Sequence, residues 1–146
     1  MVETKQELAL ERNALLAEAK RRTGLSEFGD TWFHVPLDKL IECMHAEAKL
    51  SERGEHLWAE RLTNFLENRL IRNQLLKDHP EILDEQVEVS AAILSLGRTG
   101  STKTFRLLAS PPCHTGIKGW EGFFPFPLEG EEPGNPVERR RRPGDA

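Results

Sequence analysis

The chain has 146 residues, enough for one modest domain, with 24 acidic and 20 basic side chains and a formal net charge of −4. This balance creates no global positive field, so we expect no nucleic-acid partner. No apolar run approaches the roughly 20 residues of a membrane span, and the charged N-terminus lacks the apolar core of a signal peptide. A cytoplasmic protein without a membrane span is therefore expected.

The first part of the chain predicts a helix over residues 7–22. Its apolar side consists of Leu8, Leu15, Leu16 and Ala19. Gly24 follows, and glycine is the residue that most often ends a helix.

Two further helices are expected before residue 80. Pro36 suits the first turn of a helix, and the apolar stripe that follows is Leu37, Leu40, Ile41, Met44 and Ala48. Ser51 is placed to cap the next helix, which should end before Pro80. Its apolar residues are Leu57, Trp58, Leu62, Phe65, Leu66, Leu70, Ile71 and Leu75. We interpret these stripes as packing surfaces, with a non-catalytic helical interaction module as the alternative, and we expect Asn68 and Arg69 on a solvated helix face.

A phosphate-binding pattern follows this helical part. Residues 89–96 form a short apolar run with strand character, and a helical pattern begins near Phe105. Between them lie Gly97, Arg98, Thr99, Gly100, Ser101 and Thr102. The glycines permit positive φ, so that successive N–H groups can face one concavity. The helix N-terminus, the three hydroxyls and the Arg98 guanidinium would all favour an anion.

Two families of loop compete for this pattern. A Walker A loop needs G-x-x-x-x-G-K-[ST], and residues 97–104 meet that spacing except that Thr102 stands where the second glycine belongs. A P-loop NTPase or kinase, with Lys103 and Thr104 in the Walker roles, is thus one alternative. Residues 98–102 followed by Leu107, Leu108 and Ala109 instead resemble the 5′-phosphosulfate loop of the sulfotransferase family. Residues 23–30 look like a segment near the start of one bacterial-type branch of this family.

Several other segments resemble this family in the same order along the chain. They are residues 23–30, residues 67–70 with 79–82, and residues 120–132. The resemblance thus covers about residues 7–137. It implies an α/β, P-loop-like fold, here incomplete, with a helical N-terminal subdomain at residues 1–86. Residues 87–137 would hold the first strand, the loop and its helix, and residues 138–146 would be a disordered basic tail.

The resemblance also implies a reaction and a set of site residues. A sulfuryl group would pass from 3′-phosphoadenylyl sulfate, the co-substrate, to a hydroxyl or amine of a small-molecule acceptor, and no metal would be required. The loop at residues 97–102 would hold the 5′-phosphosulfate, and Arg98 would neutralise charge on the leaving group. Glu121, at the start of the segment after the loop helix, is the candidate base, with a surface glutamate as the alternative. Full sulfotransferases are longer than this chain, so we expect a portion of a longer enzyme.

Overall fold

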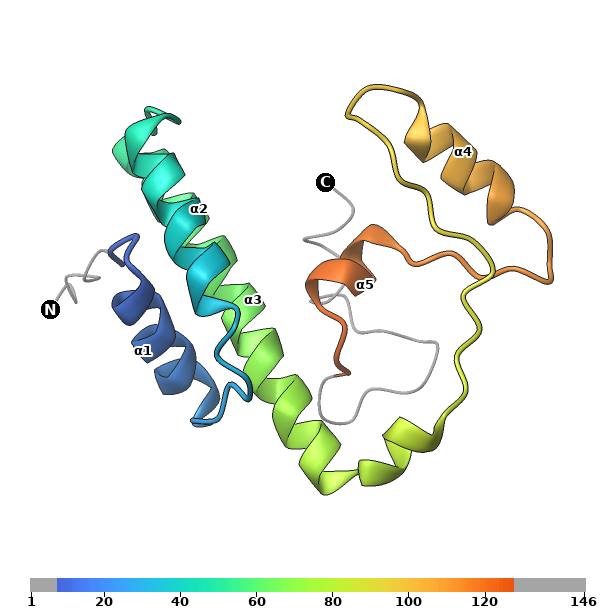
Figure 1. Ribbon diagram of the computed structural model, residues 1–146, viewed down its shortest axis with the longest axis horizontal. Coiled ribbons are helices and arrows are strands. Elements are labelled where there is room, and N and C mark those ends of the chain that lie inside the picture. The colour runs from blue at the N-terminus through green and yellow to red at the C-terminus, as the bar shows by residue number, and fades with distance from the viewer. Residues whose placement is uncertain (1–7, 128–146) are drawn as a thin grey trace, which may run out of the picture. The chain divides into compact units, whose positions relative to one another are not determined.

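The computed structural model describes residues 8–127, and in this range the secondary structure is helical (Figure 1). The elements are α1 (Arg12–Thr23), α2 (His34–Ala46), α3 (Glu52–Asp78), a 3-10 turn η1 (Pro80–Asp84), α4 (Ser101–Leu108) and α5 (Gly119–Phe123). The chain divides between Pro80 and Glu81 into two compact units. The boundary predicted after residue 86 stays a prediction, and the predicted basic tail lies outside the described residues.

Helix α1 ends as its sequence predicts, but it begins later. Gly24 takes the left-handed conformation (φ 69°), and its N–H donates to the Lys20 carbonyl. The expected start at residue 7 was wrong for residues 8–11, which are not helical. There the Leu10 carbonyl lies 3.0 Å from Nε2 of His45, a residue of α2. The Leu10 carbonyl, which the expected helix would have used for its own hydrogen bonds, contacts α2 instead. Residues 8–11 therefore take an irregular path before α1 begins.

Helices α2 and α3 follow their predicted boundary signals. Pro36 lies in the first turn of α2, where its missing N–H leaves no hydrogen bond unmade. The Ser51 hydroxyl caps α3 by accepting from the Gly54 N–H at 3.3 Å. Helix α3 ends at Asp78, before Pro80. The end of α2 at Ala46 leaves Ala48, predicted to continue its stripe, beyond the helix.

One apolar core joins these three helices. Helix α1 lies alongside α3 and also contacts α2 (Figure 1). The members with the least exposure are Leu15, Ala19, Ala59 and Leu70. Within the predicted stripes Leu37, Ile41, Met44, Leu62 and Leu66 are also buried, whereas Leu40, Leu57 and Phe65 are exposed. The stripes therefore serve mainly as packing surfaces, as expected.

A charged network lies beside this core, between α1 and α3. The Arg22 guanidinium contacts carboxylates of Glu18 at 2.6 Å, Glu60 at 2.7 Å and Glu67 at 3.4 Å. Hydrogen bonds from Arg21 and Arg22 lower the pKa of Glu18 to about 2. Burial raises the pKa of Glu67 above its usual value and outweighs the attraction to Arg22. One arginine thus ties the last turn of α1 to the surface of α3.

The second unit holds the main departure from the predicted structure. Residues 89–96 were expected to form a strand, but the described residues contain no strand there or elsewhere. A strand requires a neighbour that accepts and donates its ladder hydrogen bonds, and the described residues provide none. The α/β class therefore stays a prediction for this chain. Within residues 8–127, no helix combines the length and apolar character needed to cross a membrane.

Candidate functional site

The predicted phosphate loop forms a tight turn that leads into α4. Gly100 lies at the N-cap of α4 with φ 88° and ψ 12°. Arg98 also has positive φ, at 67°. We expected the two glycines to supply this conformation, but Gly97 is not among the described residues with positive φ. The strained position is therefore an arginine, which costs of order 1–3 kcal/mol relative to a relaxed backbone.

Hydrogen bonds within the turn determine which donors remain available. The Thr99 hydroxyl donates to the Leu96 carbonyl at 2.7 Å, so its proton is already used to close the turn. The N–H groups of Lys103 and Thr104 both donate to the Gly100 carbonyl. The N–H groups of Ser101 and Thr102 make no backbone hydrogen bond within the described residues. These two N–H groups, at the positive end of the α4 dipole, are the ones best placed for an anion.

The charge pattern around the loop adds a signal that motif matching missed. Between Glu88 and Glu121 the chain has no acidic residue, although it has 24 in total. The same stretch contains four cationic side chains: Arg98, Lys103, Arg106 and Lys118. Arg98, Thr99 and Thr102 are exposed, and Ser101 is partly exposed. An electropositive, accessible turn suits an anionic ligand.

Glu121, the candidate base, already has a structural partner. It lies in α5, and its Oε2 accepts a hydrogen bond of 2.7 Å from the Lys118 N–H just before that helix. The neighbouring Trp120 is buried, and the Lys118 ammonium lies 5.9 Å from the centre of its ring. Glu121 is partly exposed. Its carboxylate therefore helps to start α5, and its role as a base stays a prediction.

Arg69 is the residue whose importance the sequence reasoning missed. It was expected on a solvated face, but its Nε donates to the Phe28 carbonyl at 2.7 Å and a terminal nitrogen donates to the Asp30 carbonyl at 2.8 Å. Its guanidinium also lies 4.3 Å from the centre of the Phe33 ring. Arg69 thus holds the connector between α1 and α2 on α3.

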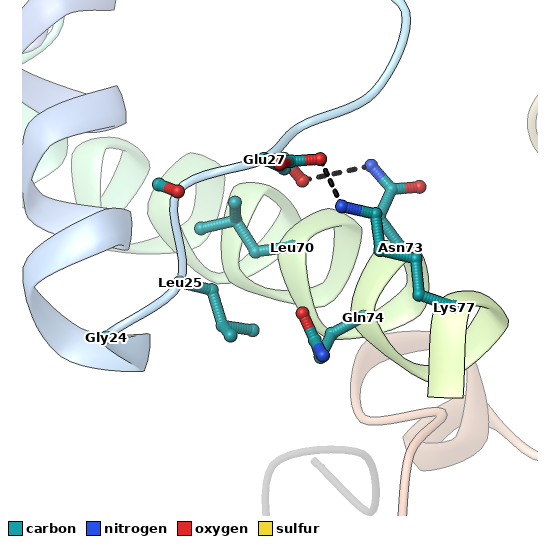
Figure 2. Close-up of a pocket in the computed structure, with 8 residues that line it drawn as sticks. Gly24, Leu25, Glu27, Leu70, Asn73, Gln74 and Lys77 are labelled. Carbon is teal, nitrogen blue, oxygen red and sulfur yellow. Dashed lines mark hydrogen bonds and ion pairs between the residues drawn. The ribbon is translucent and has the colours of Figure 1, made fainter. Parts of the chain in front are cut away.

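The same connector lines a small pocket in the first unit, of about 140 Å³ (Figure 2). Its walls come from the connector and from the last turns of α3: Gly24, Leu25, Ser26, Glu27, Leu70, Asn73, Gln74 and Lys77. Asn73 donates to the Glu27 carbonyl at 3.2 Å, and Lys77 pairs with the Glu27 carboxylate. Gly29 has φ 72°, and a Cβ there would lie 2.8 Å from Nδ2 of Asn73. Packing against α3 therefore explains Gly29, whereas Gly24 has open space around it and provides the left-handed end of α1.

Comparison with solved structures finds similarity to members of the family that the sequence motifs indicate. No family model matches the chain, and no curated protein matches it. Among solved structures, sulfotransferase STF1 of Mycobacterium tuberculosis H37Rv is similar with a TM-score of 0.71 and 29% identity, covering 84% of this chain and 34% of that one. Sulfotransferase STF9 of Mycobacterium avium is similar with a TM-score of 0.70 and 27% identity, covering 84% of this chain and 31% of that one.

The chain thus spans about a third of the length of the sulfotransferases that it matches. The motifs in the sequence and the similarity of the backbone to solved structures point to the same family. The predicted resemblance is confirmed, and the chain has a sulfotransferase-like fold.

Proposed function

We propose that this chain contributes the 5′-phosphosulfate loop of an enzyme that transfers a sulfuryl group from 3′-phosphoadenylyl sulfate to a hydroxyl or amine acceptor. The observation that carries the proposal is the turn at residues 97–102, where Arg98 keeps a left-handed backbone in front of α4. Backbone strain of this kind persists where the surrounding structure or a function requires it. The similarity to two sulfotransferases supports the same reading.

In this proposal the loop binds the donor through its backbone. The N–H groups of Ser101 and Thr102, which make no backbone hydrogen bond within residues 8–127, would donate to phosphosulfate oxygens, with the α4 dipole favouring the negative charge. Arg98 would donate charge-assisted hydrogen bonds to the bridging oxygen as the S–O bond to the adenosine bisphosphate breaks. Stabilising developing charge in this way is often the largest contribution to catalysis.

Glu121 would accept the acceptor's hydroxyl proton as the new O–S bond forms. Its Oε2 is bonded to the Lys118 N–H, which leaves Oε1 as the oxygen that would take the proton. Such a base typically contributes roughly 10²–10⁴-fold to the rate. In the complete enzyme, Glu121→Gln should therefore lower turnover by that factor while donor affinity stays unchanged, and equal turnover would reduce Glu121 to the cap of α5.

The ligand is tested by calorimetric titration with adenosine 3′,5′-bisphosphate and, separately, with ATP and Mg²⁺. We expect the bisphosphate to bind more tightly and EDTA to have no effect. Tighter binding of ATP with strict magnesium dependence would instead favour the NTPase alternative through Lys103 and Thr104. The structure already occupies the Thr104 hydroxyl, which lies 3.4 Å from the Gly100 carbonyl.

Arg98→Ala tests the residue on which the proposal depends. It should weaken bisphosphate binding by roughly 1.5–3 kcal/mol, the value of a hydrogen bond to a charged group. The fold should change little, because alanine keeps a Cβ at the same strained φ and the arginine is exposed. The matched control is Arg53→Ala, an exposed arginine of the first unit that removes the same charge. Equal weakening by both variants would show that only net charge matters.

A further inference from the structure

Gly116 lies so close to α4 that it has no room for a side chain. A Cβ at this position would lie 2.7 Å from Cζ of Phe105 and 2.8 Å from Cβ of Ala109. At Gly100 or Gly122 an added Cβ would have nothing within 4 Å. Gly116 does not have a positive φ, so its backbone conformation alone does not require glycine. The close approach to α4 does.

The burial of the connector between α4 and α5 shows that this contact is its attachment to α4. Residues 110–115 and 117–119 are exposed, whereas Gly116 is partly buried. The connector first turns, with the His114 N–H donating to the Pro111 carbonyl at 3.0 Å. It then returns to α4 at Gly116.

The segment after Gly116 leads directly to Glu121, the candidate base. The Lys118 N–H donates to Oε2 of Glu121 at 2.7 Å, and the Lys118 carbonyl accepts from the Glu121 N–H at 3.1 Å. Helix α4, on which Gly116 rests, begins at the predicted phosphosulfate loop and has 8 residues. At 1.5 Å per residue it is about 12 Å long. The loop and the segment of Glu121 are therefore attached to opposite ends of one short helix.

We propose that Gly116 is a positioning residue for the transfer reaction. Its lack of a side chain seats the segment that carries Glu121 on α4 and so fixes where the base lies relative to the loop. The inference rests on the proposed function, which supplies the roles of the loop and of Glu121.

The two neighbours of Gly116 would respond differently to an added methyl group. The Phe105 ring is 39% exposed and can turn away. The Cβ of Ala109 cannot, because it is fixed to the backbone at the end of α4, where the Ala109 N–H donates to the Phe105 carbonyl. An overpacked contact of this kind is relieved by a backbone shift. The connector would therefore move, and Glu121 would move with it.

The test compares three sets of changes. Gly116→Ala adds the methyl group that the contact excludes. Gly122→Ala is the matched control, because it adds the same group beside Glu121 in the sequence, where the space is open. The rescue combines Gly116→Ala with Phe105→Leu and Ala109→Gly, which together remove the atoms nearest to the added methyl group. The two rescuing changes without Gly116→Ala measure their own effect.

The position of the segment is measured on the full chain by nuclear magnetic resonance. A nitroxide label is attached through Lys103→Cys, at an exposed residue of α4, in a chain that carries Cys43→Ser and Cys113→Ser. The label speeds the relaxation of the amides of residues 117–122, with the inverse sixth power of their distance. Because the backbone must shift to relieve the contact, Gly116→Ala should change this relaxation by about two-fold. The control and the rescued variant should match their parents.

Kinetics adds a readout that a purely structural role would not separate. With 3′-phosphoadenylyl sulfate as donor and 4-nitrophenol as acceptor, Gly116→Ala should lower kcat by about 10–100-fold, since misplacing a reacting group by about 1 Å can cost that much. The KM for the donor should stay the same, because the loop itself is unchanged. The rescued variant should recover kcat.

Two results would overturn the proposal. One is an unchanged relaxation pattern in Gly116→Ala, and the other is a rescued variant that keeps the altered pattern. Calorimetry with adenosine 3′,5′-bisphosphate separates this inference from the proposed function. Weaker binding in Gly116→Ala alone would show that Gly116 acts on the loop and not on the base. No binding by any variant would contradict the proposed function, while the relaxation data would still decide whether Gly116 seats the segment on α4.

Discussion

Arg69 offers the sharpest test of how the first unit is held together. Replacing it with alanine removes two hydrogen bonds to the carbonyls of Phe28 and Asp30 and the contact with the Phe33 ring. The connector between α1 and α2 would lose its main attachment to α3. Gly24 and Gly29 give this connector left-handed turns, which do not themselves hold it in place.

The magnitude follows from these contacts. A hydrogen bond from a charged donor contributes about 1.5–3 kcal/mol, and a partly exposed cation–π contact adds about 0.5–1 kcal/mol. The contacts share one guanidinium and are not additive, so we expect Arg69→Ala to lower the free energy of unfolding by about 2–4 kcal/mol. Arg69→Lys should recover only part of this, because an ammonium lacks the planar fork that reaches two carbonyls.

Urea denaturation followed by circular dichroism at 222 nm measures the effect. Arg72→Ala, at an exposed arginine of the same helix, is the matched control and should change stability by no more than about 0.5 kcal/mol. Equal stability of the two variants would refute the structural role of Arg69.

Two further predictions concern the helices of the first unit. Because hydrogen bonds from Arg21 and Arg22 lower the pKa of Glu18 from 4.5 to about 2, its stabilising effect is complete above pH 4.5 and disappears as the pH falls towards 2. Thermal melts across this range should show that Glu18→Gln flattens the acid-induced loss; Glu67→Gln should not, since the raised pKa of Glu67 acts in the opposite direction. Ser51→Ala removes the cap of α3 and should cost about 1 kcal/mol in urea denaturation, whereas Ser51→Asp should cost nothing measurable; a neutral alanine variant would contradict the capping role.

Local chemistry determined much of the helical unit. Gly24, Ser51 and Pro80 act through their own backbone or through neighbours within four residues, and each marks a helix boundary where the sequence predicted it. Most buried positions followed from the helical period as well. The family motifs at residues 98–102 and 23–30 were likewise visible without coordinates.

Contacts between distant residues decided the rest. The late start of α1 accompanies a contact between Leu10 and His45, which are 35 residues apart, and the role of Arg69 depends on a connector 39 to 41 residues away. The apolar run at residues 89–96 predicts a strand only if other strands lie beside it, and the described chain offers none. Arg98, and not Gly97, has the left-handed backbone conformation in the loop. The turn that contains it is closed by the hydrogen bond from the Thr99 hydroxyl to the Leu96 carbonyl, and residue type alone does not specify this geometry. A sequence shows what each residue favours locally, whereas only the tertiary structure shows which distant partner each one meets.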